Sequence, residues 1–343
     1  MTDPQNILLV RTDRIGDLIL SLPLAGIIKE KFPAAKVSFL VRNYTKPLVD
    51  NNPDLDDVIV LSEKGNKILV LENVKKLRKH KFEAAIIIYP TFITAVIIFL
   101  SGIKIRIGSG YRWYSILFNR RVFEHRKYAE KHELEYNVNL LKELGIDHKS
   151  QVGKINFRLN IDDQSLKEVN SFLLQNGFDE RKKTVIIHPG SGGSSVDWPL
   201  ERFSQLIHLI DEKSQFNILI TGDSSESSKC QFVAKNSRAL NLAGKFDLKK
   251  LVALISKADL FISNSTGPMH IAAALGKYTI GFFPKIPSCS AKRWGAYSEK
   301  SFVFEPPIDC KNCNREQCAR LNCMNTIESD LVFYQVNKIL SSN

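Results

Sequence analysis

Residues 7–17 of the chain read ILLVRTDRIGD, and this short stretch decides the fold class. Its first four residues form an apolar run with the length of a buried strand. A helical pattern begins at Gly16 and continues to about Lys31, just before Pro33. A buried strand that leads directly into a helix opens a βαβ unit, so we expect a parallel sheet covered by helices on both faces.

The same alternation continues through the first half of the chain and restarts in the second half. In the first half, strands are expected at residues 37–41, 58–61, 82–88 and 103–107, and helices at 67–80 and 91–100. In the second half, strands are expected at residues 184–187, 217–220, 240–242, 259–263 and 279–283, and helices at 200–213, 225–236, 247–257 and 268–275. A polar stretch, 161–183, separates the two series and contains a further expected helix at 163–175.

The length of 343 residues fits two domains with one core each. We therefore predict an α/β protein of two Rossmann-like doubly wound domains, 1–160 and 161–325, facing one another across a cleft. A last helix within 326–343 is expected to cross back to the first domain. Open α/β sheets bind ligands at the carboxyl ends of their strands, so the loops at those ends are the candidates for a site.

Lys and Arg number 48 against 36 Asp and Glu, which gives a formal net charge of +12. Such an excess favours anionic partners: nucleic acid, nucleotide phosphates or an acidic membrane surface. The first six residues lack the basic and apolar segments of a signal peptide. The uncharged run 84–100 is short for a membrane span and contains Pro90, so we interpret it as a buried strand and a buried helix. We expect a soluble, cytoplasmic protein.

Four of the six cysteines form a C-x2-C-x4-C-x4-C cluster near the end of the chain: Cys310, Cys313, Cys318 and Cys323. In a protein without a secretory signal, such a cluster favours a metal site over disulfides, and its spacing permits tetrahedral zinc. Two separate C-x2-C pairs would indicate zinc more strongly than this single one. We keep zinc at these cysteines as a minor alternative and otherwise expect no metal.

The loop that follows the first strand, 11–17, carries two carboxylates and two guanidinium groups. It matches neither the dinucleotide fingerprint nor the Walker A loop. Asp17 falls in the first turn of the expected helix, where the helix dipole alone favours an acid. A carboxylate beside basic groups at the edge of a sheet is equally suited to act as a general base. Residue types and spacing leave both interpretations open.

A second loop, HPGSGGSS at 188–195, follows the first strand of the second half. The backbone N–H groups and hydroxyls of Ser191, Gly192 and Gly193 suit a phosphate or a sugar. An ordinary flexible loop would have a similar composition, but the position directly after an apolar strand favours ligand binding. Trp198, just beyond this loop, is as well suited to packing as to stacking.

A third loop, SNSTGPMH at 263–270, leads from a strand into a helix. Its residues include helix-capping types, and Pro268 suits the first turn of the helix. The N–H groups at such a helix start bind anions readily. His270 lies one turn inside the helix, where it could contact a phosphate or serve the structure alone.

Together these loops resemble the motifs of the family 9 glycosyltransferases, the lipopolysaccharide heptosyltransferases. The matching segments are RTDRIGD at 11–17, HPGSGG at 188–193 with WP at 198–199, and SNSTGPMHIAAALG at 263–276. The NLAGK segment at 241–245 and the terminal cysteine cluster, followed by Met324 and Ile327, extend the resemblance over nearly the whole chain. No single motif is decisive, but four in the same order are a strong joint signal.

The resemblance implies a B-type glycosyltransferase fold, with the acceptor on the first domain and the nucleotide-sugar on the second. Family members typically move heptose from an ADP-activated donor to the lipopolysaccharide inner core, with inversion and without a metal or other cofactor. Asp17 matches the family's catalytic aspartate, which would take the proton of the acceptor hydroxyl. The helix start at 266–268 would stabilise charge on the leaving phosphates. The donor-binding candidates are Ser191, Gly192, Gly193, Lys245, Ser265, Thr266, Gly267 and His270.

Two positions depart from the family's pattern. Members usually carry a Lys two residues before the tryptophan of the second loop, where this chain has Val196. Many members have an acid where this chain has Ser265. We therefore predict glycosyl transfer and leave the donor sugar open, with Lys245 or Arg14 as a candidate source of the missing positive charge.

The segment 104–132 carries eight Lys and Arg against two Glu, interleaved with six aromatic residues. This composition suits a phosphorylated glycolipid at an anionic membrane surface, and it suits single-stranded nucleic acid equally well. A solvated basic face over core aromatics is a third interpretation. The candidate acceptor-binding residues are Asp13, Arg14, Arg112 and Arg120.

The sequence thus predicts an inverting glycosyltransferase at the cytoplasmic face of a membrane, acting on a lipopolysaccharide core or a related envelope glycan. One alternative keeps the fold and changes the nucleotide-sugar or the acceptor. A non-enzymatic alternative is a nucleic-acid-binding protein that uses the segment 104–132 and the cysteine cluster. We expect a nucleotide-sugar, a phosphorylated glycolipid and an anionic membrane as partners, and no nucleic acid.

Overall fold

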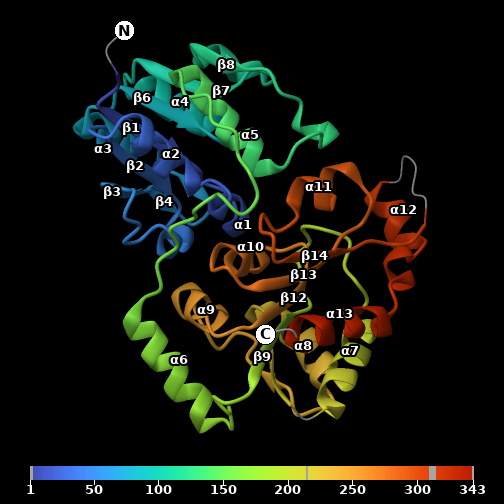
Figure 1. The fold of residues 1–343 in the computed structure, drawn as a ribbon. Coiled ribbons are helices and arrows are strands. Elements are labelled where there is room, and N and C mark those ends of the chain that lie inside the picture. Colours follow the sequence, from blue (N-terminus) through green and yellow to red (C-terminus); the bar gives the residue numbers. More distant parts are fainter. Residues whose placement is uncertain (1–2, 214, 309–313, 342–343) are drawn as a thin grey trace. The chain divides into compact units, whose positions relative to one another are not determined.

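The computed structural model describes residues 3–213, 215–308 and 314–341, which form two compact units. One unit contains Met1–Arg126 and Lys131–Asn160, and the other contains Lys127–Glu130 and Ile161–Asn343. The main change of unit, after Asn160, falls where the polar stretch 161–183 begins. Figure 1 colours the first unit from blue to green and the second from green to red.

The first unit is built on a six-stranded sheet in which every neighbouring pair is parallel. In spatial order the strands are β3 (Asp57–Val60), β2 (Lys36–Val41), β1 (Asn6–Val10), β6 (Ala84–Ile87), β7 (Ile105–Ser109) and β8 (Arg120–Val122). Five of these strands match the sequence prediction. The sixth, β8, is not predicted because it is short and two of its three residues are arginine.

The helices of the first unit are α1 (Ile15–Ile19), α2 (Pro23–Lys31), α3 (Val70–His80), α4 (Phe92–Leu100) and α5 (Glu133–Asn139). The single helix expected from Gly16 to Lys31 is wrong in one respect, because the chain turns between α1 and α2. Pro23 has no N–H to donate to the preceding turn, and it therefore begins a new helix. Short segments complete the unit: the hairpin of β4 (Glu63–Lys64) and β5 (Lys67–Ile68), and the 3-10 turns η1 (Asn43–Leu48), η2 (Trp113–Leu117), η3 (Arg126–Tyr128) and η4 (Leu140–Leu144).

The second unit repeats the same architecture. Its parallel sheet has the order β11 (Leu240–Asn241), β10 (Phe216–Ile220), β9 (Lys183–His188), β12 (Leu260–Asn264), β13 (Tyr278–Phe282) and β14 (Ser301–Phe304). Its helices are α6 (Asp163–Gln175), α7 (Leu200–Glu212), α8 (Ser227–Ala234), α9 (Leu248–Ile255), α10 (Gly267–Ala274), α11 (Ala291–Trp294), α12 (Arg315–Arg320) and α13 (Ser329–Ser341). Two six-stranded parallel sheets with helical crossovers confirm the Rossmann-like prediction for both halves.

Each sheet reverses its chain order once, between β1 and β6 in the first unit and between β9 and β12 in the second. At such a reversal the loops on the two sides diverge, and ligands bind in the crevice between them at the carboxyl ends of the strands. The loop 11–17 follows β1, and the loops 188–195 and 265–266 follow β9 and β12. The topology therefore brings the predicted loops to the two switch points.

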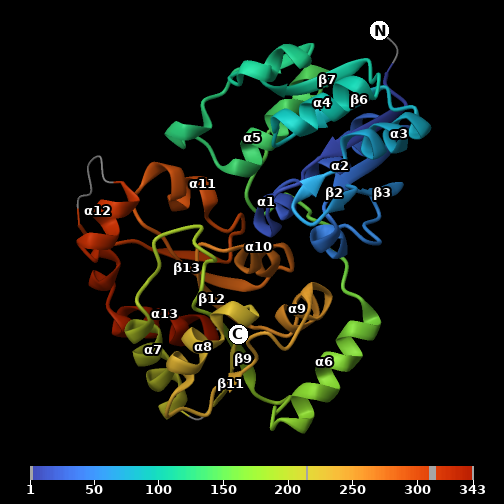
Figure 2. The same ribbon diagram turned by 180° about the vertical axis from the view of Figure 1, so that it is seen from behind.

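The last helix, α13, corrects one expectation about the domains. Its buried residues Val332, Val336, Ile339 and Leu340 belong to the core of the second unit, together with Ile207 and Ile210 of α7. Figures 1 and 2 both show α13 beside α7. The apolar face of α13 finds a matching face within its own unit, so the helix does not cross back to the first domain.

The uncharged run 84–100 divides as expected into β6 and α4, with the turn at Pro90 between them. Among the described residues, none of the helices has both the length and the apolar character needed to span a bilayer.

Candidate active site

Arg11 is the first residue after β1, and only 1% of it is exposed. Its Nε and Nη2 atoms donate to the two carboxylate oxygens of Asp13 at 2.7 and 2.9 Å. Nη2 also donates to Asp17, and Nη1 lies 3.8 Å from a carboxylate oxygen of Glu133. Burial lowers the pKa of the guanidinium group, but the three carboxylates outweigh that effect and raise its pKa. Arg11 is therefore a permanently charged centre of an acidic cluster.

Asp17 lies in the first turn of α1 with 15% of its side chain exposed. Burial raises the pKa of its carboxyl group, Arg11 lowers it, and Asp13 and Glu133 raise it again. The result is a pKa of about 6, against an ordinary value of 3.8. At neutral pH the group is ionised and more basic than an exposed aspartate, which is the property a general base needs.

Helix α5 supports this cluster through Glu133 and Asn137, both fully buried. Arg126 donates to Glu133 and, at 3.1 Å, to the side-chain oxygen of Asn137. The amide nitrogen of Asn137 donates at 3.1 Å to the carbonyl of Leu20, next to α1. Sequence reasoning missed these residues. The signal is their spacing, since an acid and an amide four residues apart lie on one face of a helix.

Two partly exposed tyrosines border the cluster. The Tyr44 hydroxyl donates to the backbone carbonyl of Asp13, and burial raises the pKa of this tyrosine. The ring of Tyr89, in the loop after β6, lies 5.6 Å from the guanidinium carbon of Arg11. The cluster is thus built from the loops on both sides of the switch point.

The four acceptor candidates fall in different places. Asp13 is part of the cluster, and the exposed Arg14 at the start of α1 is close enough for its charge to lower the pKa of Asp17. Arg112 is exposed at the start of η2, and Arg120 donates to the carbonyl of Glu143. The structure therefore brings Asp13 and Arg14 to Asp17 and leaves Arg112 and Arg120 on other elements of the same unit.

The glycine-rich loop after β9 in the second unit follows the buried His188. The Nδ1 atom of His188 lies 2.9 Å from the Thr221 hydroxyl, and burial lowers its pKa, although Glu226 opposes this effect. A side chain at Gly190 would place its first carbon 1.7 Å from a carboxylate oxygen of Glu226, so a larger residue there would displace the Glu226 side chain. Gly192 and Gly193 have φ angles of +55° and +73°, which also favour glycine.

Asn264, the last residue of β12, joins the two donor-side loops. Its amide nitrogen donates to the Pro189 carbonyl at 2.6 Å, and its oxygen accepts from the Trp198 N–H at 2.8 Å. The Ser194 hydroxyl adds a bond of 2.7 Å to the Ser265 carbonyl. The sequence indicates only a helix-capping role for Asn264, because a side chain that bridges two loops has no local signature.

Helix α10 begins beside this junction. Thr266 is its N-cap residue and makes no capping bond through its side chain, and Pro268 lies in the first turn. Ser265 and Thr266 are buried, and His270 is buried inside the helix. Backbone N–H groups at such a helix start are anion ligands, and the candidates Ser191, Gly192 and Gly193 lie on the loop tied to it.

Four further residues lie on or near the candidate donor-binding loops. Trp198 is fully buried and stacks on Phe282 at 4.0 Å, so it packs in the core. Val196 packs against the same core, and the candidate Lys245 is exposed after β11. Arg315, in the first turn of α12, donates to the carbonyls of Gly193 and Ser194 and was not predicted.

The cysteine cluster is only partly within the described residues, because Cys310 and Cys313 lie outside them. Cys318 and Cys323 are buried in a small apolar cluster with Cys289 and Ile286. In the described part of the chain, three or more His, Cys, Asp or Glu side chains never gather in a way that could hold a metal ion.

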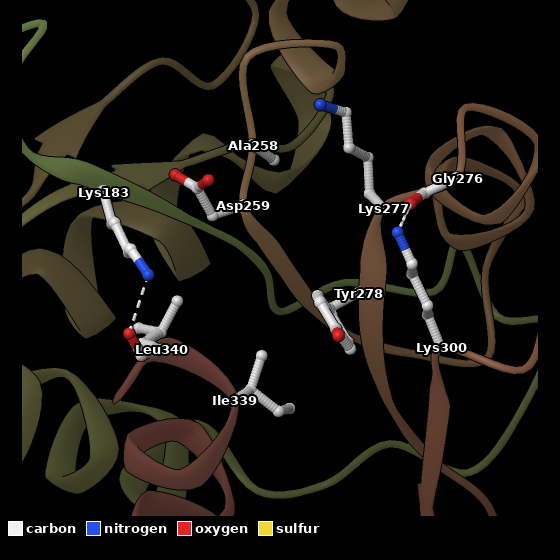
Figure 3. A pocket seen from close by; sticks show the side chains of 9 residues that line it. All are labelled: Lys183, Ala258, Asp259, Gly276, Lys277, Tyr278, Lys300, Ile339 and Leu340. Carbon is white, nitrogen blue, oxygen red and sulfur yellow. Dashed lines mark hydrogen bonds between the residues drawn. The ribbon is translucent and has the colours of Figure 1, made fainter. Parts of the chain in front are cut away.

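A cavity of about 260 Å³ lies at the opposite, amino edge of the second sheet (Figure 3). Lys183 donates to the Leu340 carbonyl at 2.8 Å, and Lys300 donates to the Gly276 carbonyl at 3.2 Å. These lysines thus satisfy carbonyls at or just beyond the ends of α13 and α10, which is an ordinary structural role. Asp259 and Lys277 complete the polar lining. We do not assign this cavity to the active site.

Comparison with solved structures identifies the fold. The chain superimposes on the glycosyl transferase family 9 structure from Veillonella parvula with a TM-score of 0.84 and 18% identity, over 99% of this chain and 98% of that one. Escherichia coli ADP-heptose lps heptosyltransferase II gives 0.79 and 19% identity, over 98% of this chain and 99% of that one. The fold is that of the B-type glycosyltransferases, with one Rossmann-like domain in each unit.

Sequence comparison then identifies the family. The model of glycosyltransferase family 9 (heptosyltransferase) matches residues 70–324. A Haemophilus influenzae protein provisionally named a glycosyltransferase is 31% identical over 310 residues, which is 88% of this chain and 90% of that protein. The lipopolysaccharide core heptosyltransferase OpsX of the same species is 25% identical over 292 residues, 82% of this chain and 79% of that protein. This chain belongs to glycosyltransferase family 9 and is an enzyme of glycosyl transfer, which favours the enzymatic prediction over the nucleic-acid-binding one.

Proposed function

We propose that this protein transfers heptose from ADP-heptose to a lipopolysaccharide-core glycolipid at the cytoplasmic face of a membrane, with Asp17 as the general base. The observation that carries the proposal is the buried cluster of Arg11, Asp13 and Asp17 at the switch point of the first sheet. Within this cluster, the carboxyl group of Asp17 has a pKa of about 6. It lies at the edge of the sheet where open α/β sheets bind ligands. Solved family relatives whose names include ADP-heptose or ADP support the choice of donor.

In the proposed reaction, the acceptor hydroxyl attacks the anomeric carbon of the heptose and Asp17 takes the hydroxyl proton. The bond from the anomeric carbon to the β-phosphate oxygen breaks, and ADP leaves with that electron pair. Arg11 holds Asp17 in place and keeps part of its charge compensated. The N–H groups at the start of α10 would stabilise the charge on the leaving diphosphate. The residues do this without a metal or another cofactor.

A second candidate keeps this mechanism and changes the donor sugar. Val196 packs against the core of the second unit where family members usually carry a lysine, and Ser265 stands where many members have an acid. Both positions belong to the donor loops, so a donor other than ADP-heptose is the specific alternative.

The experiment is a binding screen followed by a transfer assay. Thermal melting of the protein with a panel of nucleotides and nucleotide-sugars reports donor class, because a ligand of the native state raises the melting temperature. We expect ADP and ADP-heptose to stabilise the protein and ADP-heptose to support transfer to heptose-free core glycolipid. Another nucleotide-sugar could stabilise the protein and support transfer while ADP-heptose does neither. That result would assign a different donor and leave the fold assignment unchanged.

A further inference from the structure

Helix α4 is apolar on both of its faces. One face, formed by Thr94, Ala95, Ile97 and Ile98, is buried against the sheet of the first unit. The opposite face carries Phe92, Ile93, Val96, Phe99 and Leu100, at the spacing of a single helical stripe. A helix that covers a sheet ordinarily presents polar residues to water. In α4 the outward residues are instead between 40% and 47% exposed, apart from the half-buried Val96.

The 3-10 turn η2 extends this apolar surface. It packs beside α4, and the rings of Phe92 and Trp113 lie 4.8 Å apart. Trp113 is 78% exposed and Ile116 is 81% exposed. We define the α4 apolar face as Phe92, Ile93, Phe99, Leu100, Trp113 and Ile116.

Positive charge surrounds this face. Helix α3 packs beside α4 and presents Lys75, Arg78 and Lys79 to solvent. Arg78 donates to the Leu100 carbonyl at 2.8 Å, and the guanidinium carbon of Arg106 lies 5.3 Å from the centre of the Phe99 ring. The stretch 67–121, which contains these elements, has eleven Lys and Arg against two Glu. This stretch alone carries a net charge of +9, and Arg78 and Arg106 place part of that charge directly against α4.

We propose that the α4 apolar face docks on an anionic lipid bilayer. Its aliphatic and aromatic side chains would enter the boundary between headgroups and acyl chains, and the flanking Lys and Arg would pair with anionic headgroups. The exposed Trp113 is of the type that concentrates at membrane–water interfaces. The docking surface belongs to the same unit as Asp17, and this link to a glycolipid acceptor rests on the proposed function.

Charge complementarity favours a bilayer over the other occupants of such a face. A second copy of this chain in a two-fold contact would bring the same basic flank against itself. Single-stranded nucleic acid would use the cations and aromatic rings, but it would leave Ile93, Leu100 and Ile116 without a role. An anionic bilayer offers apolar chains to the α4 apolar face and negative headgroups to the Lys and Arg around it.

The test is flotation of the full-length protein with vesicles that contain no acceptor. Vesicles of phosphatidylcholine alone are compared with vesicles that also contain phosphatidylglycerol. We expect the wild type to float with the anionic vesicles, and I116E to lose about tenfold or more in partitioning. The matched control is L331E on the outer side of α13, a site that is also strongly exposed and lies in the other unit. We expect L331E to bind as the wild type does.

Three results would overturn the proposal. Equal partitioning of wild type and I116E would do so, as would equal binding to neutral and anionic vesicles. The third result is a wild type that does not bind vesicles and forms a dimer, together with an I116E variant that is monomeric. This result would assign the α4 apolar face to self-association. Thermal melting checks that I116E is folded. Since the vesicles carry no acceptor, vesicle binding without any transfer activity would contradict the proposed function alone.

Discussion

The two switch points of this enzyme have the same topology and opposite chemistry. At the end of β1, four charged side chains, those of Arg11, Asp13, Asp17 and Glu133, are packed into one network. At the ends of β9 and β12, the loops are shaped by glycine conformations and by neutral hydrogen bonds from Asn264 and Ser194. A network of buried charges can set the pKa of one acid, whereas a backbone cradle can bind an anion without titrating. Under the proposed function, the same fold would provide a proton acceptor in one unit and an anion site in the other.

The largest effect is expected for D17N, which keeps the size of the side chain and removes its basicity. Turnover should fall by roughly 10²- to 10⁴-fold, the range typical of a lost general base. Binding of ADP, measured by calorimetry, should change little because the donor loops are in the other unit. If D17N turns over nearly as fast as the wild type, Asp17 is not the general base. The proposed difference in chemistry between the two switch points would then be wrong.

The second prediction concerns the stability of the charged cluster. R11M leaves Asp13, Asp17 and Glu133 buried without their shared cation, and the free energy of unfolding should fall by about 3–5 kcal/mol. The matched control is R181M, which breaks an exposed two-point ion pair with Asp179 at 3.0 Å and should cost far less, because solvent screens an exposed pair. Chemical denaturation of both variants measures the difference. Equal losses would show that burial adds nothing to the Arg11 cluster.

The third prediction is that pH affects the two switch points differently, and it concerns kcat and KM. The pKa of Asp17 is about 6, so kcat should fall roughly tenfold per pH unit below that value as the base is protonated. The loops on the other side are shaped by backbone groups and neutral hydrogen bonds, which do not titrate, so the KM for the nucleotide-sugar should stay flat over the same range. Parallel changes of kcat and KM would contradict this division of roles.

The same shift has a consequence for stability. Because the pKa of Asp17 is raised above its unfolded value of 3.8, the folded protein loses stability as the pH rises from about 4 to about 6. D17N has no such titration. Its melting temperature relative to the wild type should therefore be higher at pH 8 than at pH 5.

The sequence predicts the loops better than it predicts their partners. The strand-to-helix alternation places the segments 11–17, 188–195 and 263–270 at the carboxyl edges of two sheets, because apolar periodicity and strand order suffice for that. It does not show that Glu133 lies beside Arg11 and is paired with Arg126, because both residues come from elements more than 100 residues away in the chain. It also does not predict that α13 packs on α7, because an apolar helix face in the sequence does not show which unit it packs against. What local patterns miss is the set of contacts that only tertiary packing creates.

The smallest effect is expected for R315A on the donor side. Arg315 donates to the carbonyls of Gly193 and Ser194, in the loop where Val196 stands in place of the family's usual lysine. We predict that R315A weakens ADP binding about three- to tenfold, since an exposed charge of this kind contributes on the order of 1 kcal/mol. K245A is the comparison, because Lys245 is the other cation that the sequence offers. If K245A weakens ADP binding and R315A does not, the phosphate contact would be assigned to Lys245 in the 241–245 loop. A loss in R315A alone would indicate that α12 contributes a cation to the anion site of the second switch point.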